Sequence, residues 1–225
     1  MDQILIKISI MLLPALLAVT AHEVAHGYAA DRCGDPTARL LGRLTFNPLK
    51  HLDVVGTLAL LFVGFGWAKP IPVNFANLRH PKKDMLWVAL AGPGANLCLA
   101  LASALALHAV RGLDNHTAVN LALVTRPVAL MAAFGLYINI ILLVFNMVPI
   151  PPLDGGRVLV ALLPQRQAEF VQRIEPFGFM LVIVLVFFTD IWQMVIGPLI
   201  FSLVTMLAGA EMAVVRDVIQ FLFGQ

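Results

Sequence analysis

The sequence predicts an all-α integral membrane protein, a bundle of about five to six transmembrane helices. Of its 225 residues, 60% are hydrophobic and only 12% are charged, whereas about 25% of the residues in a soluble domain are charged. Apolar runs recur along the chain, and its basic residues cluster in the short loops between these runs. The net charge is only +2. This pattern is typical of membrane topology and argues against a nucleic-acid partner.

A helix that crosses the hydrocarbon core needs about 20 predominantly apolar residues. The predicted spans are residues 4–30, 85–110, 128–147, 176–189 and 191–209. The last two are short and meet near Asp190, so we expect a tight helical hairpin over residues 176–209. We expect residues 211–225 to form an amphipathic helix at the membrane surface. The whole chain, residues 1–225, is predicted to be one polytopic membrane domain.

The distribution of lysine and arginine predicts which loops face the cytoplasm. The segments before and after the apolar run 54–67 are both basic, with Arg32, Arg39, Arg43 and Lys50 in one and Lys69, Arg79, Lys82 and Lys83 in the other. We therefore expect a re-entrant or β-hairpin-like segment from Val54 to Phe75. The alternative, a full crossing at 54–67, would invert every later segment. Residues 154–173 are also basic and are expected on the cytoplasmic side.

Two histidines and a glutamate stand near the inner end of the first predicted span, in the stretch His22-Glu23-Val24-Ala25-His26. Residues four apart share a face of a helix, so both imidazoles can reach one metal ion. Glu23 is close enough to deprotonate a water on that metal. Ionisable side chains inside a bilayer are costly and usually mark function. The alternative is a chance match with histidines at the membrane interface.

A catalytic zinc ion takes three protein ligands and keeps one open position. Asp154, within "FNMVPIPPLDGGRV", is the candidate third ligand, because the predicted topology brings the end of span 128–147 to the same side as the end of span 4–30. The prolines before it stop a regular helix, so we expect a non-helical segment that lines a site. The alternative for Asp154 is the N-cap of a short helix over residues 157–163.

Three motifs together resemble the site-2 protease family of intramembrane zinc metalloproteases. They are HEVAH in the first span, "AGPGAN" (residues 91–96) at the start of another, and "NMVPIPPLDGG" (residues 146–156) at the end of a third. Their order and spacing match those of the family, and they cover residues 20 to 157. The stretches "NPLKHLDVVGTL" and "GWAKPIPVN" resemble compact members that lack PDZ or CBS domains. The resemblance implies a catalytic core over about residues 4–163.

The resemblance implies that His22, His26 and Asp154 bind one Zn²⁺ and that Glu23 is the general base. Asn146 would polarise or hold the scissile carbonyl; its alternative is an asparagine that forms hydrogen bonds between helices. The implied function is regulated intramembrane proteolysis, the hydrolysis of a peptide bond within or next to a transmembrane segment of a membrane protein substrate.

Several further residues are expected to support the fold or the site. Gly92, Pro93 and Gly94 are expected to let helices pack closely, with Asn96 supporting the site from behind the ligands. His51 is expected to be solvated or to cap a helix, the alternative being that it gates or lines the site. The segment from Pro70 to Phe75 is hypothesised to be an edge that pairs with an unwound substrate, the alternative being a plain membrane-dipping loop.

A membrane zinc-binding transporter or sensor could use the same ligands, and this is the alternative function. It is disfavoured because Glu23 would then be a mere spacer and no internal repeat is visible. A relative without activity is a third possibility, disfavoured by the intact His22, Glu23, His26 and Asp154. The expected location is a prokaryotic inner membrane, with the site toward the cytoplasm. The sequence leaves the oligomeric state open.

Overall fold

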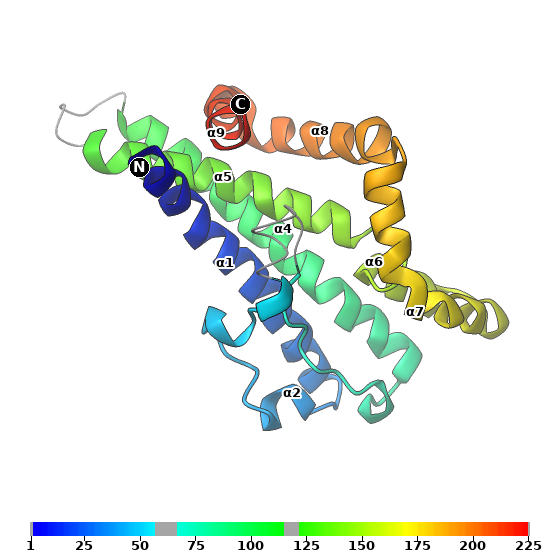
Figure 1. Cartoon of the computed structure of the whole chain (residues 1–225). Helices are drawn as coiled ribbons and strands as arrows, with labels where there is room; N and C mark the ends of the chain where they lie inside the picture. Colours follow the sequence, from blue (N-terminus) through cyan, green and yellow to red (C-terminus); the bar gives the residue numbers. More distant parts are fainter. Residues whose placement is uncertain (1, 57–66, 115–121, 225) are drawn as a thin grey trace. The chain divides into compact units, whose positions relative to one another are not determined.

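The chain is mainly helical in the computed structural model, which describes residues 2–56, 67–114 and 122–224 and contains no strand in those ranges (Figure 1). The long helices are α1 (Asp2–Arg32), α4 (Pro81–Asp114), α5 (Ala122–Asn146) and α7 (Gln165–Phe188). The short ones are α2 (Thr37–Leu40), η1 (Pro48–Lys50), η2 (Phe75–Asn77), α6 (Asp154–Leu162), η4 (Trp192–Ile196), α8 (Gly197–Ala208), η5 (Gly209–Glu211) and α9 (Met212–Phe223). The all-α prediction is confirmed.

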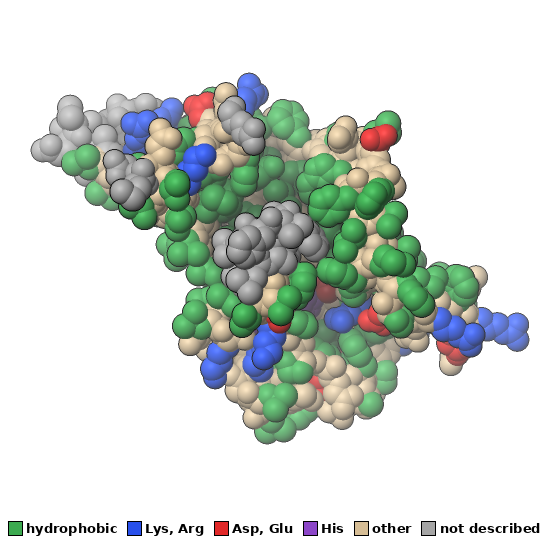
Figure 2. Space-filling view, viewed as in Figure 1, with side chains coloured by type: hydrophobic (Ala, Val, Ile, Leu, Met, Phe, Trp, Pro, Cys, Tyr) green, Lys and Arg blue, Asp and Glu red, His purple; other side chains and the backbone are tan. Residues whose placement is uncertain are grey.

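Five helical segments are long and apolar enough to cross a membrane: Gln3–Arg32, Pro81–Gly112, Leu123–Asn146, Gln165–Phe188 and Trp192–Phe223. Large apolar side chains are exposed along them, as lipid contact requires, and hydrophobic side chains cover much of the face in Figure 2. The protein is a multi-pass membrane protein. The predicted start of the fourth span at residue 176 was wrong, because α7 begins at Gln165. Its first turns are polar, so hydropathy detects only the apolar part that follows.

The structure divides into two compact units, and the first consists of Met1–Ala18, Asn96–Val144 and Ile191–Gln225. Small residues let its helices approach closely, and a Cβ on Gly135 of α5 would lie 2.9 Å from Oγ of Ser103 on α4. Asn96 on α4 is fully buried and donates hydrogen bonds to the Ala18 carbonyl (3.3 Å) and to Oδ1 of Asn139 (2.9 Å). Buried amides thus join α1, α4 and α5 within this unit.

Helix α9 belongs to the same first unit and occupies most of the segment predicted to be amphipathic. Its buried residues are Val215, Val218 and Leu222, which share one face. Lys7 of α1 donates a hydrogen bond to the Leu222 carbonyl (3.3 Å) and lies 5.4 Å from the ring centre of Phe221. The tail is therefore a helix with one buried face, and its place at the membrane surface stays a prediction.

The second unit consists of Val19–Ala95 and Phe145–Asp190. It contains the C-terminal half of α1, the start of α4, and α6 and α7. Ala30, Leu78 and Val88 form its buried apolar cluster, which joins α1, α4 and the loop between them. Helix α7 packs against the turn before α6, where a Cβ on Gly178 would overlap the Pro151 carbonyl. All residues of the candidate site described below belong to this unit.

Residues 57–66, the centre of the predicted re-entrant segment, lie outside the described residues. Its flanks are described and meet: Leu52 and Ala68 form a single antiparallel bridge, and the Lys69 N–H donates to the His51 carbonyl (2.8 Å). The described flanks contain no strand beyond this bridge. The re-entrant course of residues 54–67 stays a prediction.

Candidate metal centre

His22 and His26 project from the same face of α1, as their spacing predicts. Their Nε2 atoms lie 3.0 Å apart, and the two rings meet edge to face. Both side chains are buried, with 7% and 6% of each residue exposed. Two buried imidazoles whose nitrogens converge in this way can bind the same metal ion.

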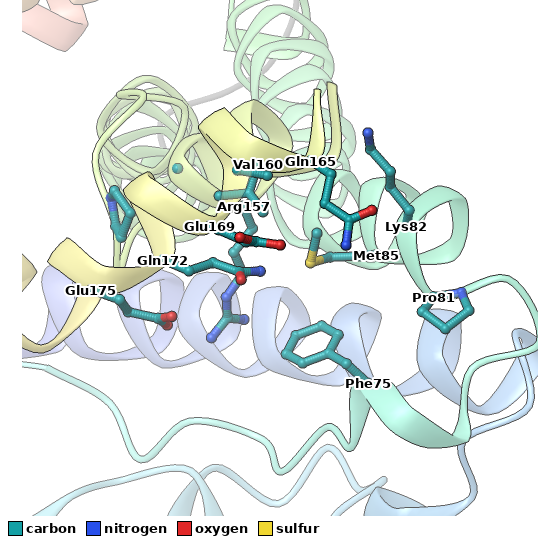
Figure 3. A pocket seen from close by; sticks show the side chains of 13 residues that line it. Phe75, Pro81, Lys82, Met85, Arg157, Val160, Gln165, Glu169, Gln172 and Glu175 are labelled. Carbon is teal, nitrogen blue, oxygen red and sulfur yellow. The ribbon is translucent and has the colours of Figure 1, made fainter. Parts of the chain in front are cut away.

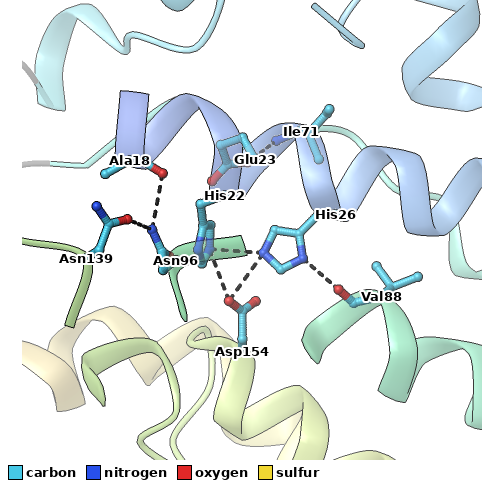
Figure 4. Close-up of polar contacts among 9 residues, drawn as sticks. All are labelled: Ala18, His22, Glu23, His26, Ile71, Val88, Asn96, Asn139 and Asp154. Atoms are coloured by element: carbon cyan, nitrogen blue, oxygen red, sulfur yellow. Dashed lines mark hydrogen bonds and ion pairs between the residues drawn. The ribbon is translucent and has the colours of Figure 1, made fainter. Parts of the chain in front are cut away.

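Asp154 is the first residue of α6 and completes the group (Figure 4). Its Oδ2 atom lies 3.2 Å from Nε2 of His22 and 3.2 Å from Nε2 of His26. The N-cap alternative was wrong, since Leu153 holds that position. The expectation of a non-helical segment holds for residues 147–153, although Asp154 itself is helical.

The three donor atoms fit a metal ion. Asp154 Oδ2 is buried and has no hydrogen-bond partner of good geometry, yet two imidazole nitrogens face it at 3.2 Å. Ligands of a tetrahedral ion with bonds of about 2.0 Å are separated by about 3.3 Å, close to these spacings. Burial opposes the charged form of Asp154, but the two imidazoles outweigh it and hold the pKa of the carboxyl below its usual range. The carboxylate is thus available as a ligand.

Helix α4 orients the histidines from the other side. Nδ1 of His26 lies 2.7 Å from the Val88 carbonyl, so Nδ1 carries the proton and Nε2 is left unprotonated, as a metal ligand must be. Gly92, one turn further along α4, lies against both rings. A Cβ at this position would overlap Nε2 of His26 and lie 2.7 Å from Cε1 of His22. The predicted close packing at Gly92 is present, and its partners are the two histidines.

Glu23 is half-buried and points toward the loop that precedes α4. Its Oε2 atom accepts a hydrogen bond from the backbone N–H of Ile71 (2.8 Å). Among the described residues no donor bonds its other carboxylate oxygen. This contact could not be predicted from the sequence, because its donor is a backbone N–H 48 residues away, and the side chain of Ile71 gives no sign of it.

Asp35 holds the same loop in place and was also missed. It is fully buried, and its carboxylate accepts hydrogen bonds from the Asn74 N–H (2.7 Å) and Asn77 Nδ2 (2.9 Å), as well as from Thr37. Burial disfavours the charge on Asp35, but these donors outweigh it and lower the pKa of the carboxyl. Since Asn74 is three residues from Ile71, Asp35 helps to fix the backbone that contacts Glu23. The sequence signal was an acid between Gly34 and Pro36, a common turn pattern.

The remaining predicted residues lie in different surroundings. Asn146 is the last residue of α5, half-buried, at the start of the turn that leads to Asp154. Asn96 belongs to the first unit, and its assignment as a support for the site stays a prediction. His51 follows η1 at its C-cap but is buried, with 1% exposed and Nε2 2.8 Å from the Thr45 carbonyl, so the solvated alternative was wrong.

Comparisons with known proteins agree with this chemistry. A model of Peptidase family M50 matches residues 116–189. The chain is 36% identical over 192 residues to "Putative zinc metalloprotease YwhC" of Bacillus subtilis, covering 84% of this chain and 85% of that protein. It is 32% identical over 179 residues to "Putative zinc metalloprotease Rip2" of Mycolicibacterium smegmatis, covering 76% of this chain and 63% of that protein. The Rip2 protein of Mycobacterium tuberculosis H37Rv is 33% identical, with 77% and 64% covered. No solved structure matches the chain.

Proposed function

Since this chain belongs to peptidase family M50, the site-2 protease family, and is a membrane metallopeptidase, we propose that it holds one zinc ion on His22, His26 and Asp154. We further propose that it hydrolyses a peptide bond within or next to a transmembrane segment of a membrane protein substrate. The observation that carries this proposal is the triangle of three donor atoms, 3.0–3.2 Å apart, with a half-buried carboxylate beside it.

The ligand set suits zinc and leaves one position open for water or substrate. When bound, zinc would supply Lewis acidity to a carbonyl and lower the pKa of a water molecule. Glu23 would accept the proton of the attacking water and return it to the leaving amine. The Ile71 N–H would hold Oε2 of Glu23, so that the other carboxylate oxygen handles the proton. Asn146 would hold the scissile carbonyl through its amide.

We propose that the site faces the cytoplasmic side of a bacterial inner membrane. The support is the basic composition of the loops around Lys69 and of residues 154–173, together with the pairing of Leu52 and Ala68 on either side of the apolar run. A carboxylate and two imidazoles near the end of a span can meet water from that side, and hydrolysis consumes water.

The test is cleavage of a model transmembrane peptide by the purified protein, with zinc content measured in the same samples. In Glu23→Gln the ligands are intact, so zinc content should stay near that of the wild type while cleavage falls by about 10²-fold or more. Asp217→Asn, at an exposed position on α9, is the matched control and should leave both unchanged. Wild-type cleavage by Glu23→Gln would contradict the proposal, and a transporter or sensor predicts zinc binding without cleavage in any variant.

A further inference from the structure

A cavity of about 460 Å³ lies beside the candidate centre and has no role in the chemistry described so far (Figure 3). Its volume is within the range of about 300–1,000 Å³ that ligand pockets occupy, so it can hold a few residues of a peptide. It lies entirely within the second unit, between the start of α4, helix α6 and the first turns of α7.

The cavity is close to the metal ligands. Gly156 and Arg157 line it, two and three residues after Asp154 on α6. Three helical residues rise by about 4.5 Å, so the wall begins within one turn of the third ligand. Pro81 and Gln165, the first residues of α4 and α7, also line it. It therefore lies where two candidate spans begin, at the boundary of the membrane and in segments predicted to be cytoplasmic.

The two basic residues of the cavity contact an aromatic ring and a carbonyl, and both keep their positive charge. The Arg157 guanidinium lies 5.5 Å from the centre of the Phe75 ring, a cation–π contact. Lys82 donates its Nζ hydrogen bond to the carbonyl of Leu163. These contacts hold the two cations on the wall formed by α4, α6 and the loop before α4.

The opposite wall is different in charge and in pairing. Glu169, Gln172 and Glu175 follow one face of α7 at three-residue intervals, and Figure 3 shows them on the wall across from Phe75. Among the described residues, no cation pairs with either carboxylate. Phe75, Met85 and Val160 supply an apolar wall beside them. The α7 wall thus offers an amide and the two acids beside apolar contact, which suits a peptide segment whose lysine or arginine side chains turn toward α7 and away from Lys82 and Arg157.

Resting on the proposed function, we infer that this cavity binds the basic juxtamembrane residues of the substrate, next to the bond that is cut. Membrane proteins carry an excess of lysine and arginine in the cytoplasmic residues flanking their spans. A substrate whose span ends at the metal centre would bring those residues to Glu169 and Glu175. An extended chain covers about 3.3–3.6 Å per residue, so a few residues reach from the centre into the cavity.

The experiment compares three substrates that share one transmembrane segment and differ only in the cytoplasmic flank, which carries lysines, glutamines or glutamates. Full-length protein in neutral detergent is assayed as wild type, as Glu169→Gln/Glu175→Gln and as Glu169→Lys/Glu175→Lys. Asp217→Asn serves as the control for loss of an exposed acid elsewhere. KM and kcat are measured separately, at low and at high salt.

For the wild type, the KM for the lysine flank should be about two- to tenfold below that for the glutamine flank, as expected for two exposed ion pairs, and high salt should reduce the difference. The double glutamine variant should lose the preference, and the double lysine variant should prefer the glutamate flank. The kcat of Asp217→Asn for each flank should equal that of the wild type, and thermal unfolding in detergent checks that all variants are folded.

Equal KM values for all three flanks in the wild type would overturn this inference while leaving the proposed function intact, because cleavage would still occur. A preference that persists in the double glutamine variant would also overturn it. A lipid headgroup as occupant predicts rates that depend on added phosphatidylglycerol and not on the flank, which is a third contrary result. No cleavage of any substrate by zinc-loaded wild type would instead contradict the proposed function.

Discussion

Gly92 of α4 lies directly against His26 of α1, so that a single methyl group at position 92 would overlap Nε2, the proposed ligand atom. Two residues on, Gly94 has no atom within 4 Å of the place where its Cβ would stand. The same helix therefore contains one glycine on which the geometry of the candidate metal centre depends and another that has no such constraint.

Gly92→Ala is expected to displace His26 and to reduce the zinc content of the purified protein after dialysis against a weak chelator. Gly94→Ala should retain zinc and gain slightly in stability, since alanine is preferred over glycine in a helix by about 0.5–1 kcal/mol. Metal analysis and thermal unfolding of both variants check this prediction. Equal zinc content in the two variants would show that the helices can separate without cost.

Asp154→Asn is expected to lower zinc affinity by about 100-fold or more, because it removes the charged ligand while keeping the volume of the side chain. Loss of a residue that only orients a ligand already costs about 10–100-fold. His22→Ala should have a similar effect, and Asp217→Asn should have none. Zinc loss in His22→Ala combined with full zinc content in Asp154→Asn would contradict the assignment of Asp154 as the third ligand.

Asp35→Asn is expected to destabilise the loop before α4. The buried carboxylate accepts several hydrogen bonds, and losing some of them should cost about 2–3 kcal/mol, or about 5–10 °C in Tm. Cleavage should fall as well, because the loop contacts Glu23 through Ile71. Thermal unfolding in detergent measures the first effect, with Asp217→Asn as the control.

The stability contribution of Asp35 should also depend on pH. Because the pKa of this carboxyl is lower in the folded protein than its ordinary value of 3.8, its contribution to stability is complete at pH values above that ordinary pKa. It is lost as the pH falls through the lower, folded pKa. Between pH 7 and pH 3 the wild type should therefore lose more stability than Asp35→Asn. Parallel curves for the two proteins would contradict the structural role of the charge.

Labelling of single cysteines tests the proposed topology. With Cys33 and Cys98 replaced by serine, an exposed cysteine at Lys69→Cys should react with an impermeant maleimide only from the cytoplasmic side. Asp190→Cys, at an exposed position between α7 and η4, should react only from the outside. Reaction of Lys69→Cys from outside intact cells would refute the re-entrant interpretation of residues 54–67.

Much of this protein could be predicted from the sequence because the relevant patterns are local. Composition and the length of apolar runs indicate a helical membrane protein, and a spacing of four puts His22 and His26 on one face of α1. Asp154 could be proposed because the prolines and glycines around it interrupt a helix. Hydropathy failed at the start of α7, where the first turns are helical but polar.

Only the tertiary structure decided which groups surround these residues. The Val88 carbonyl, the Ile71 N–H and the Cα of Gly92 contact the HEVAH helix from 48 or more residues away. Every residue has a backbone carbonyl, and every residue except proline has a backbone N–H, so residue type does not show which of them contacts the site. Nor does it show which glycine leaves space for a neighbouring side chain. Sequence spacing specifies neighbours along one helix, whereas contacts between helices depend on how the helices pack.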